Sequence, residues 1–345
     1  MLYATTRSNL DFETANRALC ENRAPNGGFY VPFRAPQFSQ EEILTLGKQT
    51  FNTSVAMVLN RLFNARLTAF DVDFCIGRYS VRLSRMSQRI LMGECWHNLD
   101  GNVDRIIANL YRLLRTGGSE TDLPGEWAGI AVRIAVVFGL FGELLRTGAA
   151  DLEKKVDVSV VSGDFSAPMA LWYAREWGLP IGNIILCCNE NGGLWDLFNR
   201  GQMRTDLIAV PTSTPEADVA LPAGLERLIY ECGGTGEVNR FLDACRRGGT
   251  YFPGDFLYAK LRKGFHVSVV SQKRILRTIP SVYGTTSCVL SSHTALAYAG
   301  LMDYRAGTGE SRTALVMAKK SPARDLDTVA RSLGIGSDVL KRHLD

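Results

Sequence analysis

The chain has 345 residues, of which 46% are hydrophobic and 21% charged, and its net charge is +4. This composition is that of a globular protein and excludes a disordered or fibrous chain. Acidic residues alternate with basic ones, so no basic stripe for nucleic acid is predicted. The longest apolar run, 130–141, contains Arg133 and is too short to cross a bilayer. The N-terminus lacks a signal-peptide pattern, and we expect a soluble, cytoplasmic protein without nucleic-acid or membrane partners.

The N-terminal third is predicted to be mainly helical. A helix is expected over 12–21, followed by a turn-rich segment at 24–32. Two long amphipathic stretches, 41–63 and 104–115, have the helical period. The glycine-rich segment 117–125 then reads as a linker.

A strand–loop–helix–strand series follows an apolar helix that we expect over 126–145. The strand 156–162 enters a tight loop at 163–168, a helix spans 169–177, and a second strand spans 184–188. Such a series is one βαβ crossover, which implies parallel strands.

The C-terminal third continues the alternation of helix and strand that is typical of an α/β protein. Helices are expected over 222–232, 237–247 and 292–303, a strand over 312–319, and a last helix from residue 325.

The cysteines predict neither a metal site nor a disulfide framework. There are eight, and none forms a C-x-x-C pair. Cys187 and Cys188 end an apolar run, which predicts two side chains on opposite faces of a buried strand. A redox-sensitive pair is the alternative.

Several short segments share their residues, order and spacing with one enzyme family. They are Tyr3–Arg7, Ala24–Pro32, Val161–Pro180, Cys188–Asn191, Thr212–Asp218, Leu225–Tyr230, Ser292–Ala295 and Leu315–Ala323. Together they resemble the threonine synthases over most of the chain. The resemblance implies an α/β fold in which helices flank an open, largely parallel sheet. This would be a truncated form of the type II pyridoxal-phosphate enzyme (tryptophan synthase β-like) fold.

The same resemblance exposes a missing lysine. In threonine synthases a lysine follows a Glu–x–aromatic–His stretch, which here is similar to Glu94–His97, and Asp104 falls at the lysine position. No lysine occurs between Lys48 and Lys154. Because only a primary amine forms the Schiff base with pyridoxal phosphate (PLP), we expect neither the cofactor nor a catalytic residue here.

The segment similar to the family's phosphate loop also departs from it. Gly163, Asp164, Phe165 and Ser166 stand where the family has glycine, asparagine, phenylalanine and glycine. The Asp164 carboxylate would repel a phosphate, by about 4 kcal/mol for two unit charges at about 4 Å and a dielectric of about 20. Lys319 falls where the family places a hydroxyl near the pyridine nitrogen, and a pair of Lys319 with Asp104 is one hypothesis.

The resemblance divides the chain into two regions. Residues 1–116 are similar to the N-terminal region of the synthases, with the small substrate-loop domain largely missing. Residues 126–345 form the large α/β domain with the remnant phosphate loop. The predicted remnant of the cofactor cleft consists of His97, Asp104, Gly163, Asp164, Phe165, Ser166, Asn189 and Lys319.

Other chemistries find little support. His97 and His293 match family histidines, and we interpret them as hydrogen-bonded structural residues. No G-x-S-x-G serine motif occurs. Asp100 and Asp104 begin a predicted helix, where carboxylates favour the N-terminal dipole; a paired acid/base site is the alternative.

We therefore expect a degenerate threonine synthase homologue, a pseudoenzyme of amino-acid biosynthesis in bacterial-type metabolism, that acts as a binding or partner protein. One alternative is an active enzyme that uses the remnant cleft. It would be a threonine synthase-like carbon–oxygen lyase that binds PLP and a phosphohomoserine-type substrate, or an enzyme that acts on another phosphorylated metabolite. A second alternative is a subunit that pairs with a complete threonine synthase.

Overall fold

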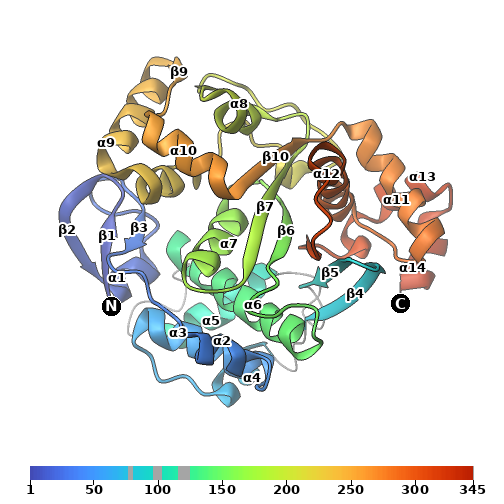
Figure 1. The fold of residues 1–345 in the computed structure, drawn as a ribbon, viewed down its shortest axis with the longest axis horizontal. Coiled ribbons are helices and arrows are strands. Elements are labelled where there is room, and N and C mark those ends of the chain that lie inside the picture. The colour runs from blue at the N-terminus through green and yellow to red at the C-terminus, as the bar shows by residue number, and fades with distance from the viewer. Residues whose placement is uncertain (77–80, 96–102, 116–124, 345) are drawn as a thin grey trace.

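The computed structural model describes residues 1–76, 81–95, 103–115 and 125–344, without the side chains of residue 76 and residues 103–106. Its centre is a six-stranded sheet in the order β10-β7-β6-β11-β5-β4 (Figure 1). In that order the strands are β10 (Phe265–Val269), β7 (Ile181–Cys188), β6 (Val156–Val161), β11 (Ala314–Ala318), β5 (Ile90–Glu94) and β4 (Arg82–Ser87). Every neighbouring pair is parallel except β4 with β5, which is antiparallel. The predicted α/β fold with a largely parallel sheet is confirmed.

Helices surround this sheet and connect its strands. They are α1 (Ala15–Cys20), α2 (Gln40–Leu46), α3 (Phe51–Phe63), α4 (Ala69–Ile76), α5 (Val103–Leu114), α6 (Glu126–Arg146), α7 (Ser166–Glu176), α8 (Gly193–Arg200), α9 (Leu225–Arg247), α10 (Asp255–Gly264), α11 (Gln272–Thr286), α12 (Ser292–Thr308), α13 (Leu326–Leu333) and α14 (Ser337–Leu344). Short 3-10 turns are η1 (Pro215–Ala217) and η2 (Pro322–Asp325). Helices α6 and α7 pack in one apolar core and α11 and α12 in another, so the sheet is covered on both faces, as parallel sheets require.

Cys187 and Cys188 demonstrate the two faces of β7. Cys187 belongs to the core under α12, whereas Cys188 belongs to the core that contains α6 and α7. Both thiols are free and buried. The predicted placement on opposite faces of a buried strand is confirmed, because successive side chains of a strand point to opposite sides.

A smaller sheet near the N-terminus lies beside α9 (Figure 1). Its order is β2-β1-β3, with β1 (Leu2–Thr5), β2 (Ser8–Thr14) and β3 (Tyr30–Pro32) antiparallel. A two-stranded ribbon joins β8 (Met203–Arg204) to β9 (Thr250–Tyr251). The predicted helix over 12–21 is wrong in its first part, because residues 12–14 continue β2 and α1 begins at Ala15.

Other predicted boundaries need similar corrections. The stretch 41–63 is two helices, because α2 ends at Leu46 and Thr50 caps a new helix by accepting the Thr53 backbone N–H. The two helices predicted over 222–232 and 237–247 are the halves of α9, which bends at Gly234, where φ is 76°. Glycine tolerates this left-handed φ without strain.

Helix α6 is largely buried and confirms the apolar helix that the sequence predicts over 126–145. It has 21 residues and, by length and composition, could cross a membrane, but 78% of its most apolar window is buried inside the protein. It packs against α2, α3 and α7. This burial is consistent with a soluble protein.

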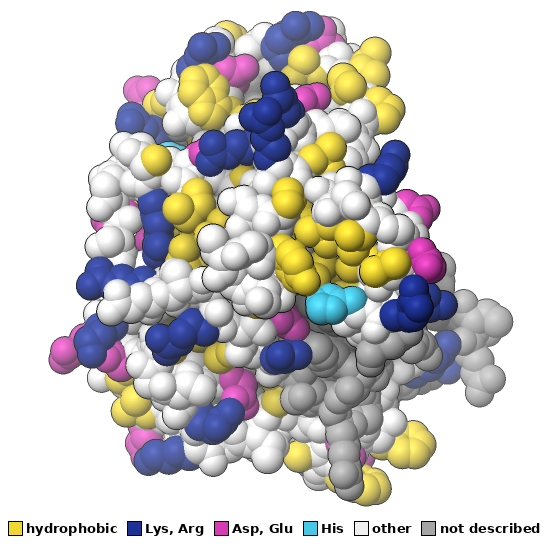
Figure 2. Space-filling model, turned by 90° about the vertical axis from the view of Figure 1, so that its right-hand side faces the viewer, with side chains coloured by type: hydrophobic (Ala, Val, Ile, Leu, Met, Phe, Trp, Pro, Cys, Tyr) yellow, Lys and Arg dark blue, Asp and Glu magenta, His cyan; other side chains and the backbone are white. Residues whose placement is uncertain are grey.

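The two regions that the sequence predicts share one sheet and one core. Strands β4 and β5 come from the first region; β5 pairs with β11 of the second region, and β4 pairs with β5 at the edge of the sheet. The division into regions 1–116 and 126–345 stays a prediction, and the linker at 117–125 lies almost wholly outside the described residues. On the face shown in Figure 2, basic and acidic side chains are interspersed, as expected from the small net charge.

Candidate functional site

A cavity of about 420 Å³ opens where the parallel strands β5, β6 and β11 end. Ligands of open α/β sheets bind at this carboxyl edge, where the strand ends and the following loops leave a crevice. The residues that line it are Cys95, Arg133, Val136, Val137, Val160, Val161, Ser162, Gly163, Asp164, Ala167, Ala170, Glu216, Val219, His293, Met317, Ala318 and Lys319. The cavity has an apolar body, and its charged side chains come from separate elements.

The loop between β6 and α7 forms one wall. Gly163 has a φ of +45° and Phe165 a φ of 75°, so the chain makes two left-handed steps before α7 begins. The Phe165 side chain is fully buried and anchors the turn in the core. Left-handed backbone is unusual for a bulky residue, and it persists here because the packing of the ring holds it.

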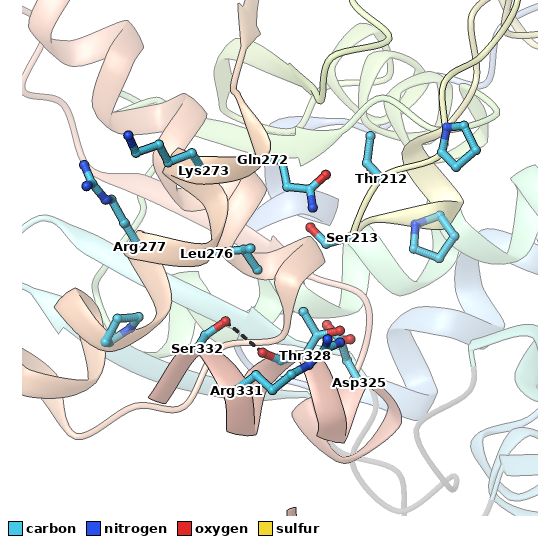
Figure 3. A pocket seen from close by; sticks show the side chains of 13 residues that line it. Thr212, Ser213, Gln272, Lys273, Leu276, Arg277, Asp325, Thr328, Arg331 and Ser332 are labelled. Carbon is cyan, nitrogen blue, oxygen red and sulfur yellow. Dashed lines mark hydrogen bonds between the residues drawn. The ribbon is translucent and has the colours of Figure 1, made fainter. Parts of the chain in front are cut away.

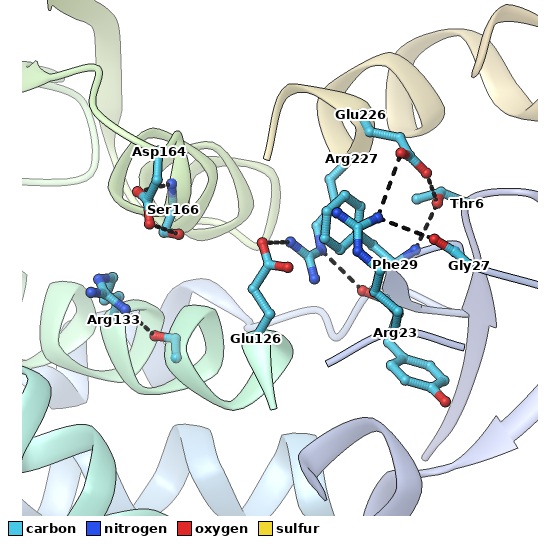
Figure 4. Close-up of polar contacts among 12 residues, drawn as sticks. Thr6, Arg23, Gly27, Phe29, Glu126, Arg133, Asp164, Ser166, Glu226 and Arg227 are labelled. Atoms are coloured by element: carbon cyan, nitrogen blue, oxygen red, sulfur yellow. Dashed lines mark hydrogen bonds and ion pairs between the residues drawn. The ribbon is translucent and has the colours of Figure 1, made fainter. Parts of the chain in front are cut away.

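Asp164 and Ser166 of this loop are joined by two hydrogen bonds (Figure 4). The Ser166 backbone N–H donates to Asp164 Oδ1 at 3.0 Å, and the Ser166 hydroxyl donates to Oδ2 at 2.9 Å. Both carboxylate oxygens thus accept from the residue that begins α7. A carboxylate at a helix N-terminus is favoured by the helix dipole.

Lys319, at the opposite wall, pairs with the 3-10 turn η1. Its Nζ lies 3.1 Å from Glu216 Oε2, and Lys320 Nζ lies 3.4 Å from Glu216 Oε1. Burial alone would raise the pKa of the Glu216 carboxyl, but Lys319, followed by His293 and Lys320, lowers it to about 2. Lys319 is therefore engaged with Glu216, while its predicted pair with Asp104 stays a prediction, because the Asp104 side chain lies outside the described residues.

His293, near the start of α12, is a buried polar side chain of the cavity. It is only 4% exposed, and neither ring nitrogen has a hydrogen-bond partner among the described residues. Burial lowers its pKa, although Glu216 opposes the shift. His293 therefore differs from the hydrogen-bonded structural histidine that the sequence predicted, and a buried unpaired ring calls for a ligand or water.

Arg133 enters the cavity from α6. Its Nη1 donates to the Gly129 carbonyl oxygen of its own helix at 3.1 Å (Figure 4). Arg133, Glu216 and Cys95 were not among the predicted site residues. Arg133 is the one charge inside a long apolar run, and that pattern is the signal that could have identified it.

The predicted site residues divide into three groups. Gly163, Asp164 and Lys319 line the cavity, and Phe165 and Ser166 support its loop. Asn189, at the end of β7, lies in a separate network, where its amide donates to the Thr212 and Thr214 hydroxyls at 2.9 Å and to Asp218 at 2.6 Å. His97 lies outside the described residues, and Asp104 is described only as backbone of α5.

A larger groove of about 830 Å³ lies between α11, α13 and the segment before η1 (Figure 3). Its cations Lys273 and Arg277 are exposed on α11 and extend away from Ser213 and Asp325, whereas Arg331 of α13 extends toward Asp325. Because Lys273 and Arg277 do not converge on the other polar side chains, the groove has less of the character of a binding site than the cavity at the strand ends.

In comparisons with known proteins, the chain is similar to threonine synthases in sequence and in fold. Residues 2–78 match the family model described as Threonine synthase N terminus. In fold, the chain is similar to PLP-bound threonine synthase from Brucella melitensis, with a TM-score of 0.81 at 17% identity, covering 97% of this chain and 92% of that chain. Yeast threonine synthase matches with a TM-score of 0.80 at 16% identity, covering 96% and 90%. The fold is that of the type II PLP-dependent threonine synthases.

Sequence relatives agree with the fold. The threonine synthase of Pseudomonas aeruginosa is 28% identical over 239 residues, which is 66% of this chain and 50% of that protein. The human protein Threonine synthase-like 1 is 26% identical over 176 residues, which is 50% of this chain and 24% of that protein. The chain spans about half the length of the threonine synthases it matches. In sequence it is similar to threonine synthases and to threonine synthase-like proteins.

Proposed function

We propose that this chain is a degenerate threonine synthase homologue that does not carry out PLP-dependent catalysis and uses the cavity at the strand ends to bind a small ligand or to support a partner protein. The observation that carries the proposal is the missing amine. No lysine occurs between Lys48 and Lys154, and Asp104, the second residue of α5, stands where the resemblance places the Schiff-base lysine. A carboxylate cannot form an imine.

The described cavity residues support this proposal. Lys319 is the lysine that lines the described part of the cavity, and its Nζ is held 3.1 Å from the Glu216 carboxylate. The Ser166 backbone N–H, which would be available to a phosphate at the start of α7, is taken by Asp164. These residues do not suit PLP, which needs both a free amine and an anion-binding loop.

The test is to incubate the purified chain with PLP, reduce with borohydride and locate any adduct by mass spectrometry. We expect no imine absorbance and no stoichiometric adduct on any one lysine. The matched control is Lys319→Arg, which keeps the charge beside Glu216 and removes the amine that lines the cavity. A stoichiometric adduct on Lys319 that disappears in Lys319→Arg would contradict the proposal.

The remaining expectations belong to the same proposal. The chain would act in the cytoplasm, and a complete threonine synthase from the same organism is the partner to test. Size-exclusion chromatography of the two purified proteins together checks this, and independent elution at micromolar concentrations would remove the partner role. Turnover of a phosphohomoserine-type substrate by the purified chain would favour the alternative, an active carbon–oxygen lyase.

A further inference from the structure

Three backbone N–H groups at the loop that begins α7 already have acceptors within the protein. The Ser162 N–H donates to the Cys187 carbonyl at 3.0 Å, and the Phe165 N–H donates to the Ser162 carbonyl at 2.9 Å. The Ser166 N–H donates to Asp164 Oδ1 at 3.0 Å. A loop that binds a phosphate instead directs such N–H groups at the ligand. The loop has a turn of this kind, and one of its own carboxylates takes the place of the anion.

The backbone around Asp164 is held from outside the loop. The Gly224 N–H donates to the Asp164 carbonyl at 3.2 Å. A Cβ on Gly224 would lie 2.8 Å from that oxygen, so the segment before α9 packs directly on the loop. The buried Phe165 ring holds the next residue. Asp164 therefore remains beside Ser166 unless both of these contacts open.

Each cation that lines the described part of the cavity has a partner other than Asp164. Lys319 is paired with Glu216, and Arg133 donates to the Gly129 carbonyl of its own helix. The deeper walls are apolar, formed by valines of α6 and β6 and by Met317. Within this interior, His293 offers two unpartnered ring nitrogens among the described residues, which suits one uncharged hydrogen-bonding group such as a hydroxyl or carbonyl.

We propose that Asp164 determines the ligand specificity of this cavity: by holding the Ser166 amide, its carboxylate makes the cavity reject phosphate-bearing ligands and accept net-neutral ligands with an apolar ring or chain. The inference rests on the proposed function of the cavity as a ligand site and names the class of ligand that it takes. Asp164 acts against phosphate in two ways, because it adds a like charge and removes a donor.

A pair of probes that differ only in phosphate tests this inference. Pyridoxine and pyridoxine 5'-phosphate have the same ring, and neither has an aldehyde, so neither forms an imine with lysine. Isothermal titration of the full chain should show pyridoxine preferred by about tenfold or more, which corresponds to about 1.4 kcal/mol. Asp164→Asn keeps an oxygen acceptor and removes the charge, whereas Asp164→Gly removes both.

We expect the affinity for pyridoxine 5'-phosphate to rise by about tenfold in Asp164→Asn and further in Asp164→Gly, while pyridoxine binding changes by less than about threefold. Glu41→Gln is the matched control, because Glu41 is an exposed carboxylate on α2 and its loss changes the net charge equally. This control should not alter binding of either probe.

Two results would overturn the inference. One is a wild-type chain that prefers the phosphorylated probe. The other is a pair of Asp164 variants that keep the wild-type circular dichroism and unfolding midpoint yet gain no phosphate affinity. If neither probe binds the wild type but Asp164→Gly binds the phosphorylated one, the rejection of phosphate by Asp164 is supported. Failure of the proposed function is read separately, from a borohydride-trapped lysine, because these probes cannot form that adduct.

Discussion

A Cβ atom on Gly300 of α12 would lie 2.3 Å from Sγ of Cys187 on β7. The helix approaches the sheet this closely along its buried face, where the Ser268 hydroxyl donates to the Gly300 carbonyl at 3.0 Å and the Ser159 hydroxyl donates to the Ala297 carbonyl. Glycine at 300 thus sets the distance between α12 and the sheet. His293 lies at the start of the same helix, so this packing also positions the cavity.

Replacing Gly300 by alanine is therefore expected to lower the free energy of unfolding by about 1–3 kcal/mol, because neither the Cys187 side chain nor the strand can move away freely. Gly307 lies in the same helix, and a Cβ added there would have no atom of another residue within 4 Å. Gly307→Ala should leave stability unchanged or raise it by up to about 1 kcal/mol. Urea unfolding of the wild type and both variants checks this. Equal urea midpoints for Gly300→Ala and Gly307→Ala would contradict the close packing at Gly300.

A buried ion pair ties the N-terminal sheet to α9. Glu226 is 3% exposed and accepts hydrogen bonds from Arg7 Nη2 at 2.8 Å and from Arg7 Nε at 3.0 Å. The Thr6 hydroxyl also donates to Glu226 (Figure 4). Glu226→Ala should lower the free energy of unfolding by about 3 kcal/mol, because it leaves these donors unpaired. The exposed pair of Asp338 with Arg342 at 3.4 Å is the control, and Asp338→Ala should change stability by less than about 1 kcal/mol.

Glu231 of α9 should make stability fall between mildly acidic and neutral pH. Burial raises the pKa of its carboxyl to about 7 from 4.5, although the Tyr173 hydroxyl, which donates to Oε1 at 2.7 Å, opposes the shift. The folded state binds the proton more tightly, so stability falls as pH rises from about 4.5 to about 7. Between pH 4.5 and 8 this decline should amount to about 1–3 kcal/mol in the free energy of unfolding, and Glu231→Gln should remove it. Parallel pH profiles of the two proteins would contradict the assignment.

The Glu216 pair with Lys319 has the opposite pH dependence. Because the pKa of Glu216 falls from 4.5 to about 2, its stabilising effect is complete above about pH 4.5 and is lost as pH falls toward 2. The pair is partly exposed, so Glu216→Gln should lower the free energy of unfolding at pH 7 by less than about 1 kcal/mol. The difference in the free energy of unfolding between wild type and variant should disappear near pH 2. If the difference persists at that pH, the effect comes from another contact of Glu216.

The sequence predicted the elements that form the cavity better than those at its edges. The valines of β6 followed by Gly163 identify a buried strand and a tight turn, and the loop, α7 and β7 followed in the predicted order. Strand β4 was missed because serines and arginines interrupt its apolar residues at the sheet edge. Helix α11 was missed because Pro280 lies inside it, where proline normally argues against a helix.

The ion pair between Glu216 and Lys319 in the cavity could not be predicted from local sequence patterns. Glu216 and Lys319 are far apart in the chain, and only the fold brings them to 3.1 Å. The sequence therefore suggested a free Lys319 that could meet Asp104. The two hydrogen bonds from Ser166 to Asp164, in contrast, could have been predicted from the sequence. The two residues are two positions apart, and an aspartate just before a helix commonly accepts such bonds.

Helix α6 has a consequence for how the chain is made. Apolar residues surround nearly its whole circumference, and one of the helices that cover it, α7, is synthesised after it. A nascent chain that stops before α7 would expose this helix to solvent, where it would aggregate or recruit chaperones. The protein therefore cannot be divided after α6 into two soluble fragments, and any shorter form of it would have to retain the helices on both sides.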